Sequence, residues 1–221
     1  MIVEAPGGAF ASEHAYVEKD ETDADPHSLS LFYFVYSVLF APGYRRRYSD
    51  FLETEFPRIP LPRESRLTNE LVALGGELVA LHLMESSRLE RSITAILGGD
   101  AFLVEKVAYS DETVWIDKAK SRGFKGVPEE VWNFHIGGYQ VCEKWLKDRQ
   151  AKGGKNPRPG RVLTDEDIEH YQKIVVALSE TIRIMAEIDE VIEAHGGWPG
   201  AFVTEAEELP KVAEDAADYD A

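Results

Sequence analysis

One long amphipathic helix near the C-terminal end constrains the fold of this chain more than any other segment. Between Thr164 and Gly196 the apolar residues recur at spacings of three and four, which is the period of one helix face. The members of this stripe are Ile168, Tyr171, Val175, Leu178, Ile182, Met185, Ile188 and Ile192. Thr164 with Asp167 three residues later predicts a capping box, and Gly196-Gly197 predicts the end. A helix about 45 Å long, at 1.5 Å per residue, must bury such a stripe.

Two arrangements can bury this stripe. A helix predicted over Leu67–Met84 has leucines at the same spacing, so the two helices can pack together within one chain, which is the arrangement we predict. The alternative is that the Ile168–Ile192 face docks against another chain. Gly75 and Gly76 weaken the Leu67–Met84 helix, so we expect another backbone to approach it closely there.

Two shorter helices are predicted upstream. Residues 28–41 are apolar almost all round, which is typical of a short helix buried on most faces, and Pro42 ends it. A helix over Tyr44–Glu55 follows, with Arg45, Arg46 and Arg47 in its first turns. The proline-rich segment 57–65 then excludes further helix.

The middle of the chain has short apolar runs rich in β-branched and aromatic residues. The runs 102–109 and 113–117 predict a β-hairpin, and Phe124–Val127 predicts a third strand. Pro128 predicts the first position of a helix that stops near Gly137-Gly138, and a further helix over Tyr139–Arg149 leads into a basic Gly/Pro segment. We therefore predict an α+β domain over 28–198, with helical residues 28–97 and 164–196 and a smaller strand-containing recognition part over 100–160.

Charge is distributed unevenly along the 221 residues, whose formal net charge is −16. Residues 1–27 and 205–221 each hold seven acidic residues and one basic residue, and we predict mobile acidic tails over 1–27 and 199–221. Segment 118–161 instead holds eleven basic and four acidic residues, a net charge of +7. Such a segment can attract nucleic acid, although taken alone an ordinary solvated surface is the favoured explanation.

The residue types exclude several classes of site. The single cysteine, Cys142, excludes an internal disulfide, and no Cys/His group has zinc-ligand spacing, so we predict a metal-free protein in the reducing cytoplasm. The longest apolar stretch, Leu29–Ala41, is shorter than the roughly 20 residues of a membrane helix. We interpret His135, beside Trp132 and Phe134, as a histidine satisfied within a packed corner.

Motifs for ATP or methyl transfer are also absent from the sequence. Gly153-Gly154-Lys155 lacks the spacing of a phosphate-binding loop. Asn156-Pro157 is followed by Arg158, which departs from the Asn-Pro-Pro-aromatic order that holds a flipped adenine in methyltransferases. We predict no cofactor and no catalytic residue.

The run from Val114 to Leu146 reads VWIDKAKSRGFKGVPEEVWNFHIGGYQVCEKWL. With the Leu-Phe-Tyr and Phe-Pro-Arg-Ile-Pro segments between Leu31 and Pro60, it resembles the C-terminal specificity domain of single-chain Type ISP restriction-modification enzymes. The resemblance extends from about Leu31 to Val203. It implies that this chain recognises duplex DNA for a restriction-modification system and positions it for an adenine methyltransferase located elsewhere. It also implies that this chain is not itself an enzyme.

The resemblance and the residue types together give candidate DNA-binding residues. The loop from Lys118 to Lys125 is the best candidate for entering a groove, because Gly123 and Gly126 can act as pivots. Amide side chains can pair with base edges. The full candidate set is Lys118, Lys120, Arg122, Lys125, Asn133, Tyr139, Gln140, Lys144 and Lys147.

Alternatives stay open for one part of this set and for the whole chain. Gly137-Gly138 either brings the start of the Tyr139 helix close to a phosphate or forms a plain turn. The chain could instead be an interaction protein that docks through the Ile168–Ile192 face, or a non-functional remnant of a larger enzyme.

Overall fold

The structure, a computed structural model, describes residues 26–99, 101–155 and 157–203. The helices are α1 (Pro26–Phe40), α2 (Pro42–Arg47), α3 (Ser49–Thr54), α4 (Ser65–His82), the 3-10 helix η1 (Ser87–Glu90), α5 (Glu129–Trp132), α6 (Val141–Lys147), α7 (Asp165–Ala194) and α8 (Gly197–Gly200). The strands are β1 (Ala95–Leu97), β2 (Phe102–Leu103), β3 (Ala108–Ser110), β4 (Thr113–Trp115), β5 (Gly123–Lys125), β6 (His135–Ile136), β7 (Tyr139–Gln140) and β8 (Val162–Leu163). The predicted α+β class is confirmed.

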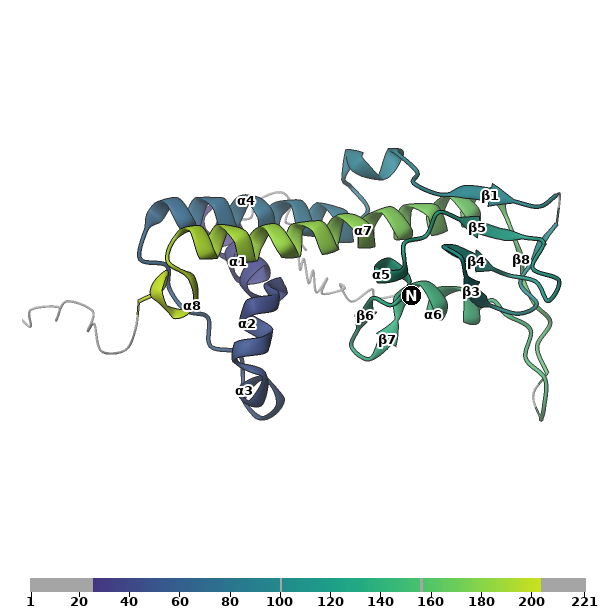
Figure 1. Cartoon of the computed structure of the whole chain (residues 1–221), viewed down its shortest axis with the longest axis horizontal. Helices are drawn as coiled ribbons and strands as arrows, with labels where there is room; N and C mark the ends of the chain where they lie inside the picture. The colour runs from purple at the N-terminus through teal and green to yellow at the C-terminus, as the bar shows by residue number, and fades with distance from the viewer. Residues whose placement is uncertain (1–25, 100, 156, 204–221) are drawn as a thin grey trace, which may run out of the picture.

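Helix α7 is the axis of the molecule, with α4 beside one half of it and the strands around the other (Figure 1). The predicted capping box is confirmed. The Thr164 hydroxyl accepts a hydrogen bond from the Asp167 N–H at 3.2 Å, and the Asp167 carboxylate accepts one from the Thr164 N–H at 3.1 Å. Gly196, at φ 111°, follows the last turn in the left-handed conformation that ends helices.

The apolar stripe of α7 is buried within the chain. Its buried members are Ile168, Tyr171, Val175, Leu178, Ile188 and Ile192. Ile182 and Met185 are half-buried, because Thr181 and Ile184 occupy the innermost positions of that turn. The predicted packing against the 67–84 helix is confirmed, since α4 and α7 share one core. The alternative in which this face docks another chain is therefore wrong.

The helical part of the molecule consists of α1 to α4, α8 and the C-terminal half of α7. Helices α1 and α4 approach each other closely at Gly75, where an added Cβ would lie 1.9 Å from the Tyr33 carbonyl oxygen. The expected backbone contact is thus confirmed for Gly75. At Gly76 an added Cβ would only touch the Tyr33 ring, at 3.4 Å.

The single helix predicted over Tyr44–Glu55 is wrong, because the chain bends at Tyr48 between α2 and α3. Tyr48 has φ −112° and ψ 20°. Its ring packs edge-on against Trp198, with ring centroids 6.3 Å apart, while the buried Tyr44 donates a hydrogen bond to the Arg58 carbonyl at 2.9 Å. These tertiary contacts override the local helical preference.

The sheet part consists of the strands, α5, α6 and the N-terminal half of α7. Its main sheet is antiparallel, in the order β1-β5-β4-β3. Phe124 of β5 packs on Tyr171 of α7, with ring centroids 4.5 Å apart, and both side chains are fully buried. The N-terminal half of α7 thus contributes one side of a second hydrophobic core.

The strand predictions for the sheet part are partly confirmed. The predicted hairpin exists as β3 and β4, and the predicted third strand as β5. The run 102–109 is not one strand, because the N–H groups of Glu105 and Lys106 both bond to the Ile116 carbonyl and interrupt the ladder. Its first two residues instead form β2 and pair with β8. Strand β1 falls in the range that we expected to be helical.

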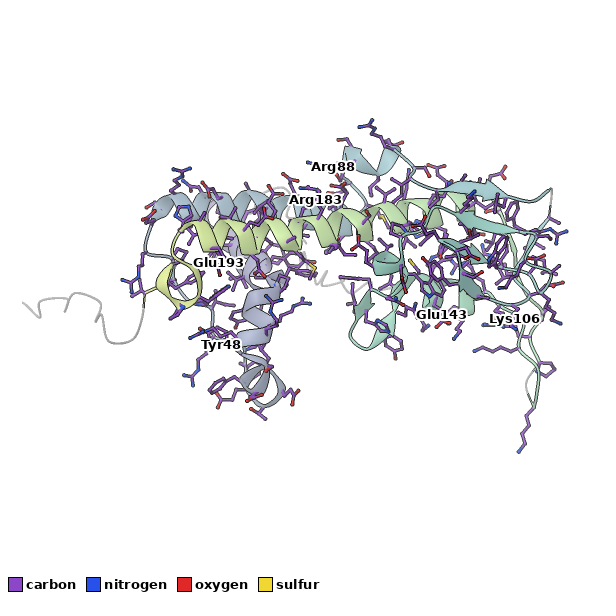
Figure 2. All side chains as sticks on the ribbon, viewed as in Figure 1. Tyr48, Arg88, Lys106, Glu143, Arg183 and Glu193 are labelled. Atoms are coloured by element: carbon purple, nitrogen blue, oxygen red, sulfur yellow. The ribbon has the colours of Figure 1, made fainter. Side chains whose placement is uncertain are left out.

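Ion pairs fasten the junction between the two parts. Arg88 of η1 pairs with Glu180 of α7 at 3.1 Å and with Glu77 of α4 at 3.2 Å. Arg183, one turn along α7, pairs with Glu180 at 3.0 Å; Figure 2 labels both arginines at this junction.

The predicted acidic tails, 1–27 and 199–221, lie outside the described residues except at 26–27 and 199–203. The described beginning of the second range is packed, since Ala201 and Phe202 are buried and Phe202 forms an isolated bridge with Pro62. Among the described helices, none combines the length and the apolar character needed to cross a membrane.

Candidate nucleic-acid interface

The loop between β4 and β5 is held in one shape by the carboxylate of Asp117. Asp117 is 5% exposed. It accepts hydrogen bonds from the Ser121 N–H at 2.9 Å, the Ser121 hydroxyl at 2.7 Å and the Arg122 N–H at 3.1 Å. Burial by itself would raise the pKa of Asp117, but these hydrogen bonds and the nearby guanidinium outweigh it, so the pKa lies below its ordinary value. The loop is therefore fixed around a charged anchor.

Four predicted site residues lie on this loop and on β5. Lys118, Lys120 and Lys125 are exposed, and Arg122 is half-buried. The Lys120 ammonium donates to the Ser110 hydroxyl at 3.3 Å, and its backbone has φ 53°. Within residues 26–99, 101–155 and 157–203, none of these four cations forms an ion pair. The charges of the three lysines are thus available to a ligand, whereas the guanidinium of Arg122 also stabilises the Asp117 carboxylate.

The other five predicted site residues lie beyond the opposite end of β5, on α5, the β6–β7 hairpin and α6 (Figure 1). Asn133 is exposed at the end of α5. The Gln140 amide donates to the Trp132 carbonyl, so one of its donors is already used within the fold. Lys144 pairs with Asp148, and Lys147 pairs with Glu143 at 2.9 Å. The residues that we predicted as one set therefore form two separate groups in the structure.

The helix predicted over Tyr139–Arg149 exists as α6, but its predicted start at Tyr139 is wrong, because Gly137-Gly138 forms a hairpin turn. The φ angles of Gly137 and Gly138 are 55° and 81°, which suit a two-residue turn, and β6 and β7 pair on either side of it. The preceding helix, α5, ends at Trp132 rather than near Gly137, and α6 begins only at Val141. The idea that these glycines aim a helix start at a phosphate is therefore not supported.

His135 is exposed, so its interpretation as a packed histidine is wrong. Its Nδ1–H donates to the Asn133 carbonyl oxygen at 2.6 Å, which fixes the ring beside the hairpin. In the part of the chain that the structure describes, no cluster of His, Cys, Asp or Glu could hold a metal ion. Burial raises the pKa of the Cys142 thiol to about 12, against a smaller lowering effect of Tyr171, so this thiol does not ionise near neutral pH.

A third basic element, which our candidate set omitted, is the arm between α6 and β8. Lys152 and Arg158 face each other across an isolated β-bridge and bring the two sides of the arm together. The side chains of Lys152, Lys155 and Arg158 are exposed. The arm extends away from the sheet in Figure 1. The signal in the sequence was the basic Gly/Pro composition of 151–161.

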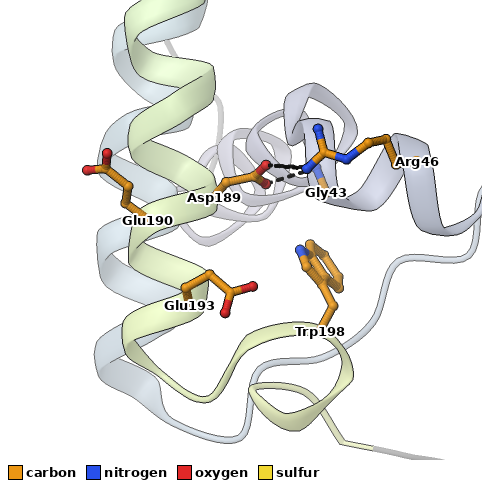
Figure 3. Close-up of a pocket in the computed structure, with 6 residues that line it drawn as sticks. All are labelled: Gly43, Arg46, Asp189, Glu190, Glu193 and Trp198. Carbon is orange, nitrogen blue, oxygen red and sulfur yellow. Dashed lines mark hydrogen bonds and ion pairs between the residues drawn. The ribbon is translucent and has the colours of Figure 1, made fainter.

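A cavity of about 430 Å³ lies on the helical part, lined by Gly43, Arg46, Asp189, Glu190, Glu193 and Trp198 (Figure 3). Asp189 accepts hydrogen bonds from the Gly43 N–H at 2.9 Å and pairs with Arg46 at 3.3 Å. Three carboxylates against one guanidinium make this cavity unsuitable for phosphate. It is not part of the basic surface.

Comparison with known proteins identifies a family for this chain. The family model of the Type ISP C-terminal specificity domain matches residues 10–187. No curated protein sequence matches the chain.

The fold is similar to that of several solved structures, of which three are described. A nuclease-deletion mutant of the Type ISP restriction-modification enzyme LlaGI, in complex with a DNA substrate mimic, is 21% identical, with a TM-score of 0.56 over 73% of this chain and 16% of that chain. The ATP-dependent Type ISP enzyme LlaBIII bound to DNA is 18% identical, with a TM-score of 0.57 over 77% and 11%. A DrdV–DNA complex is 22% identical, with a TM-score of 0.55 over 73% and 18%. The chain therefore spans less than a fifth of each of these proteins.

Proposed function

The chain belongs to the Type ISP C-terminal specificity domain family, and from this membership we propose that it recognises the target sequence of a restriction-modification system on duplex DNA. In this proposal residues 28–198 form the target-recognition domain, and the recognition part lies over about 100–160. The protein positions the duplex, and an adenine methyltransferase located elsewhere acts on it. The chain itself has no catalytic role.

The observation that carries the proposal is the anchored basic loop. Asp117 holds the β4–β5 loop with hydrogen bonds from three donor groups, while Lys118 and Lys120 extend from it without ion pairs in the described residues. A fixed loop loses little conformational entropy when it binds. Cations on it can neutralise phosphates, which supplies most of the affinity of a protein for DNA and positions it on the duplex.

The solved neighbours support the ligand class. The titles of the LlaGI, LlaBIII and DrdV structures each name DNA or a DNA mimic as bound to those proteins. In our proposal this chain takes the same class of ligand, and the net charge of +7 over 118–161 in an otherwise acidic chain favours it.

Selection from a randomised duplex pool at low salt, followed by a salt titration of the retained DNA, tests this function. We expect enrichment of a short motif and an affinity that falls steeply as salt rises, because bound cations release counterions from DNA. Failure of the purified chain to retain any duplex at low salt would contradict the proposal.

Charge reversal tests the loop itself. In the triple variant Lys118→Glu, Lys120→Glu and Arg122→Glu we expect the slope of log affinity against log salt to fall by about 3, about one unit for each lost phosphate contact. A single Lys118→Glu change is matched by Arg91→Glu, because Arg91 is also exposed but follows η1, outside the β4–β5 loop. Equal losses in these two single variants would show that only net charge matters.

A further inference from the structure

The tip of the β6–β7 hairpin exposes two large apolar side chains that the fold does not use. Ile136 is 48% exposed and Tyr139 is 61% exposed. Both stand next to the Gly137-Gly138 turn, where an added Cβ would meet no atom within 4 Å. The tip therefore projects into solvent. Solvation alone would favour polar residues at such a position.

The two apolar side chains form a single small surface. Ile136 and Tyr139 are directly opposite each other in the antiparallel ladder, so both point to the same face of the hairpin. His135 and Gln140 form the next pair and point to the other face, where Gln140 bonds to the Trp132 carbonyl. One face of the hairpin thus fastens it to the protein, and the other is free.

The base of the hairpin is rigid. Trp132 at the end of α5 stacks on Tyr109, with ring centroids 5.0 Å apart and an interplanar angle of 7°. The Val141 N–H closes the hairpin by donating to the Phe134 carbonyl at 3.2 Å. Cys142 and Leu146 of α6, the helix that follows the hairpin directly, are buried. An exposed apolar tip on a fixed base can enter a binding partner without first being ordered.

The charges near the tip favour a polyanion as this partner. The Lys144 ammonium, which also pairs with Asp148, lies 5.8 Å from the centroid of the Tyr139 ring, so one cation borders the apolar face. An apolar side chain beside a cation suits a groove of duplex DNA, where the phosphates line the edges and the base pairs form the interior. In that interior an aliphatic or aromatic side chain can pack on a thymine methyl group or wedge against a base step.

We propose that Ile136 and Tyr139 are the apolar base contacts of this domain, and that they confer sequence preference while the β4–β5 loop supplies affinity. The inference rests on the proposed function, because it assigns the bases of the same duplex to one named element. It separates two roles in space: phosphates are held at the end of the sheet that carries Lys118–Arg122, and bases are read beyond the end where β5 leads into α5.

Two alanine variants test the inference. For Ile136→Ala and Tyr139→Ala we expect the affinity for the selected motif to fall about tenfold, the effect of losing one stacked or packed base contact. The affinity for a scrambled duplex and the salt slope should stay at the wild-type values, because non-specific binding is electrostatic. Tyr139→Phe should keep the preference of the wild-type protein, because the ring makes the contact.

Ile96→Ala is the matched control, because Ile96 is 46% exposed on β1 and distant from the hairpin. We expect it to leave the motif preference intact. Thermal unfolding of all four variants should match that of the wild-type protein, since the substituted side chains are exposed.

The outcomes separate this inference from the proposed function. If the wild-type chain enriches a motif and the hairpin variants enrich it equally well, the inference is wrong and the proposed function stands. The same holds if the variants lose affinity for motif and scrambled duplex alike. If the wild-type chain retains DNA without any preference, the inference is wrong and so is the proposal that this chain by itself recognises a target sequence. If the wild-type chain retains no duplex, both ideas fail together.

Discussion

The helical part and the sheet part share α7 but use it differently. In the helical part, leucines of α4 and isoleucines of α7 form a continuous core, and helix backbones come into direct contact at Gly75. In the sheet part the strands are two or three residues long, and three non-glycine residues, Asp111, Glu112 and Lys120, have φ between 50° and 53°. A regular framework thus supports a part made largely of loops, which is a common division between scaffold and binding surface.

This difference predicts how the two parts unfold. Because α7 contributes one half to each core, neither core can lose it without losing buried apolar surface. We therefore expect a single cooperative transition, in which damage to one part lowers the stability of the other.

The largest effect should come from Gly75→Ala. The added methyl group would lie 1.9 Å from the Tyr33 carbonyl oxygen, so α1 and α4 would have to separate. We expect the free energy of unfolding in urea to fall by about 3 kcal/mol. Gly76→Ala is the control, because its methyl group meets the Tyr33 ring only at 3.4 Å and alanine favours the helix.

The same variant also tests whether the helical part and the sheet part unfold together. Helix content, followed by circular dichroism, reports mainly on the helical part, whereas tryptophan fluorescence reports mainly on the sheet part, which holds Trp115, Trp132 and Trp145. Coincident transitions in Gly75→Ala would support a shared α7. A fluorescence transition that stays at the wild-type midpoint would show two independent units.

A smaller effect is expected from Asp167→Ala at the start of α7. Asp167 accepts from the Thr164 N–H and pairs with Arg161 at 3.0 Å and with Arg149 at 3.7 Å. Its loss removes a helix cap and the ion-pair partner of the half-buried Arg149, which should lower the free energy of unfolding by about 2 kcal/mol. Glu166→Ala, in the same helical turn but exposed, should change it by less than about 0.5 kcal/mol. Equal losses in the two variants would contradict this account of the cap.

The framework could be predicted from the sequence, because helix periodicity is a local signal. The stripe on α7, its capping box and its end at Gly196 were all predicted, as was the close approach at Gly75. The strands were harder to predict from the sequence. Strand β1 has only three residues and is defined by its partner β5, which lies 26 to 30 residues away in the sequence. A pairing of this kind is a tertiary property that no local pattern contains.

The candidate site was predicted in composition but not in arrangement. The cations of the β4–β5 loop were identified from charge, yet Asp117, which holds that loop, resembled any other acidic residue in the sequence. Gly137-Gly138 was read as a helix end, although glycine pairs also form two-residue hairpins. That error hid the exposure of Ile136, because an isoleucine next to a helix end gives no reason to expect a solvent-facing tip.

The smallest expected effect is a pH dependence of the free energy of unfolding, because His82 is a titratable group within the helical part. The Thr181 hydroxyl donates to the Ala177 carbonyl, so it accepts from His82 Nε2–H at 2.9 Å, and His82 Nδ1 accepts from the Tyr36 hydroxyl at 2.7 Å. This neutral form links α1, α4 and α7, and burial lowers the pKa of His82.

In the window below the unfolded pKa of about 6.5, the unfolded chain then binds more protons than the folded protein, so stability falls as pH falls. The slope should stay well under the limit of about 1.4 kcal/mol per pH unit, because His82 is only half-buried. Urea unfolding of the wild-type protein and of His82→Gln between about pH 7.5 and pH 5.5 measures the difference in slope that belongs to His82. Identical slopes would show that the network tolerates the charged ring, and that the helical part is less rigidly specified than its packing indicates.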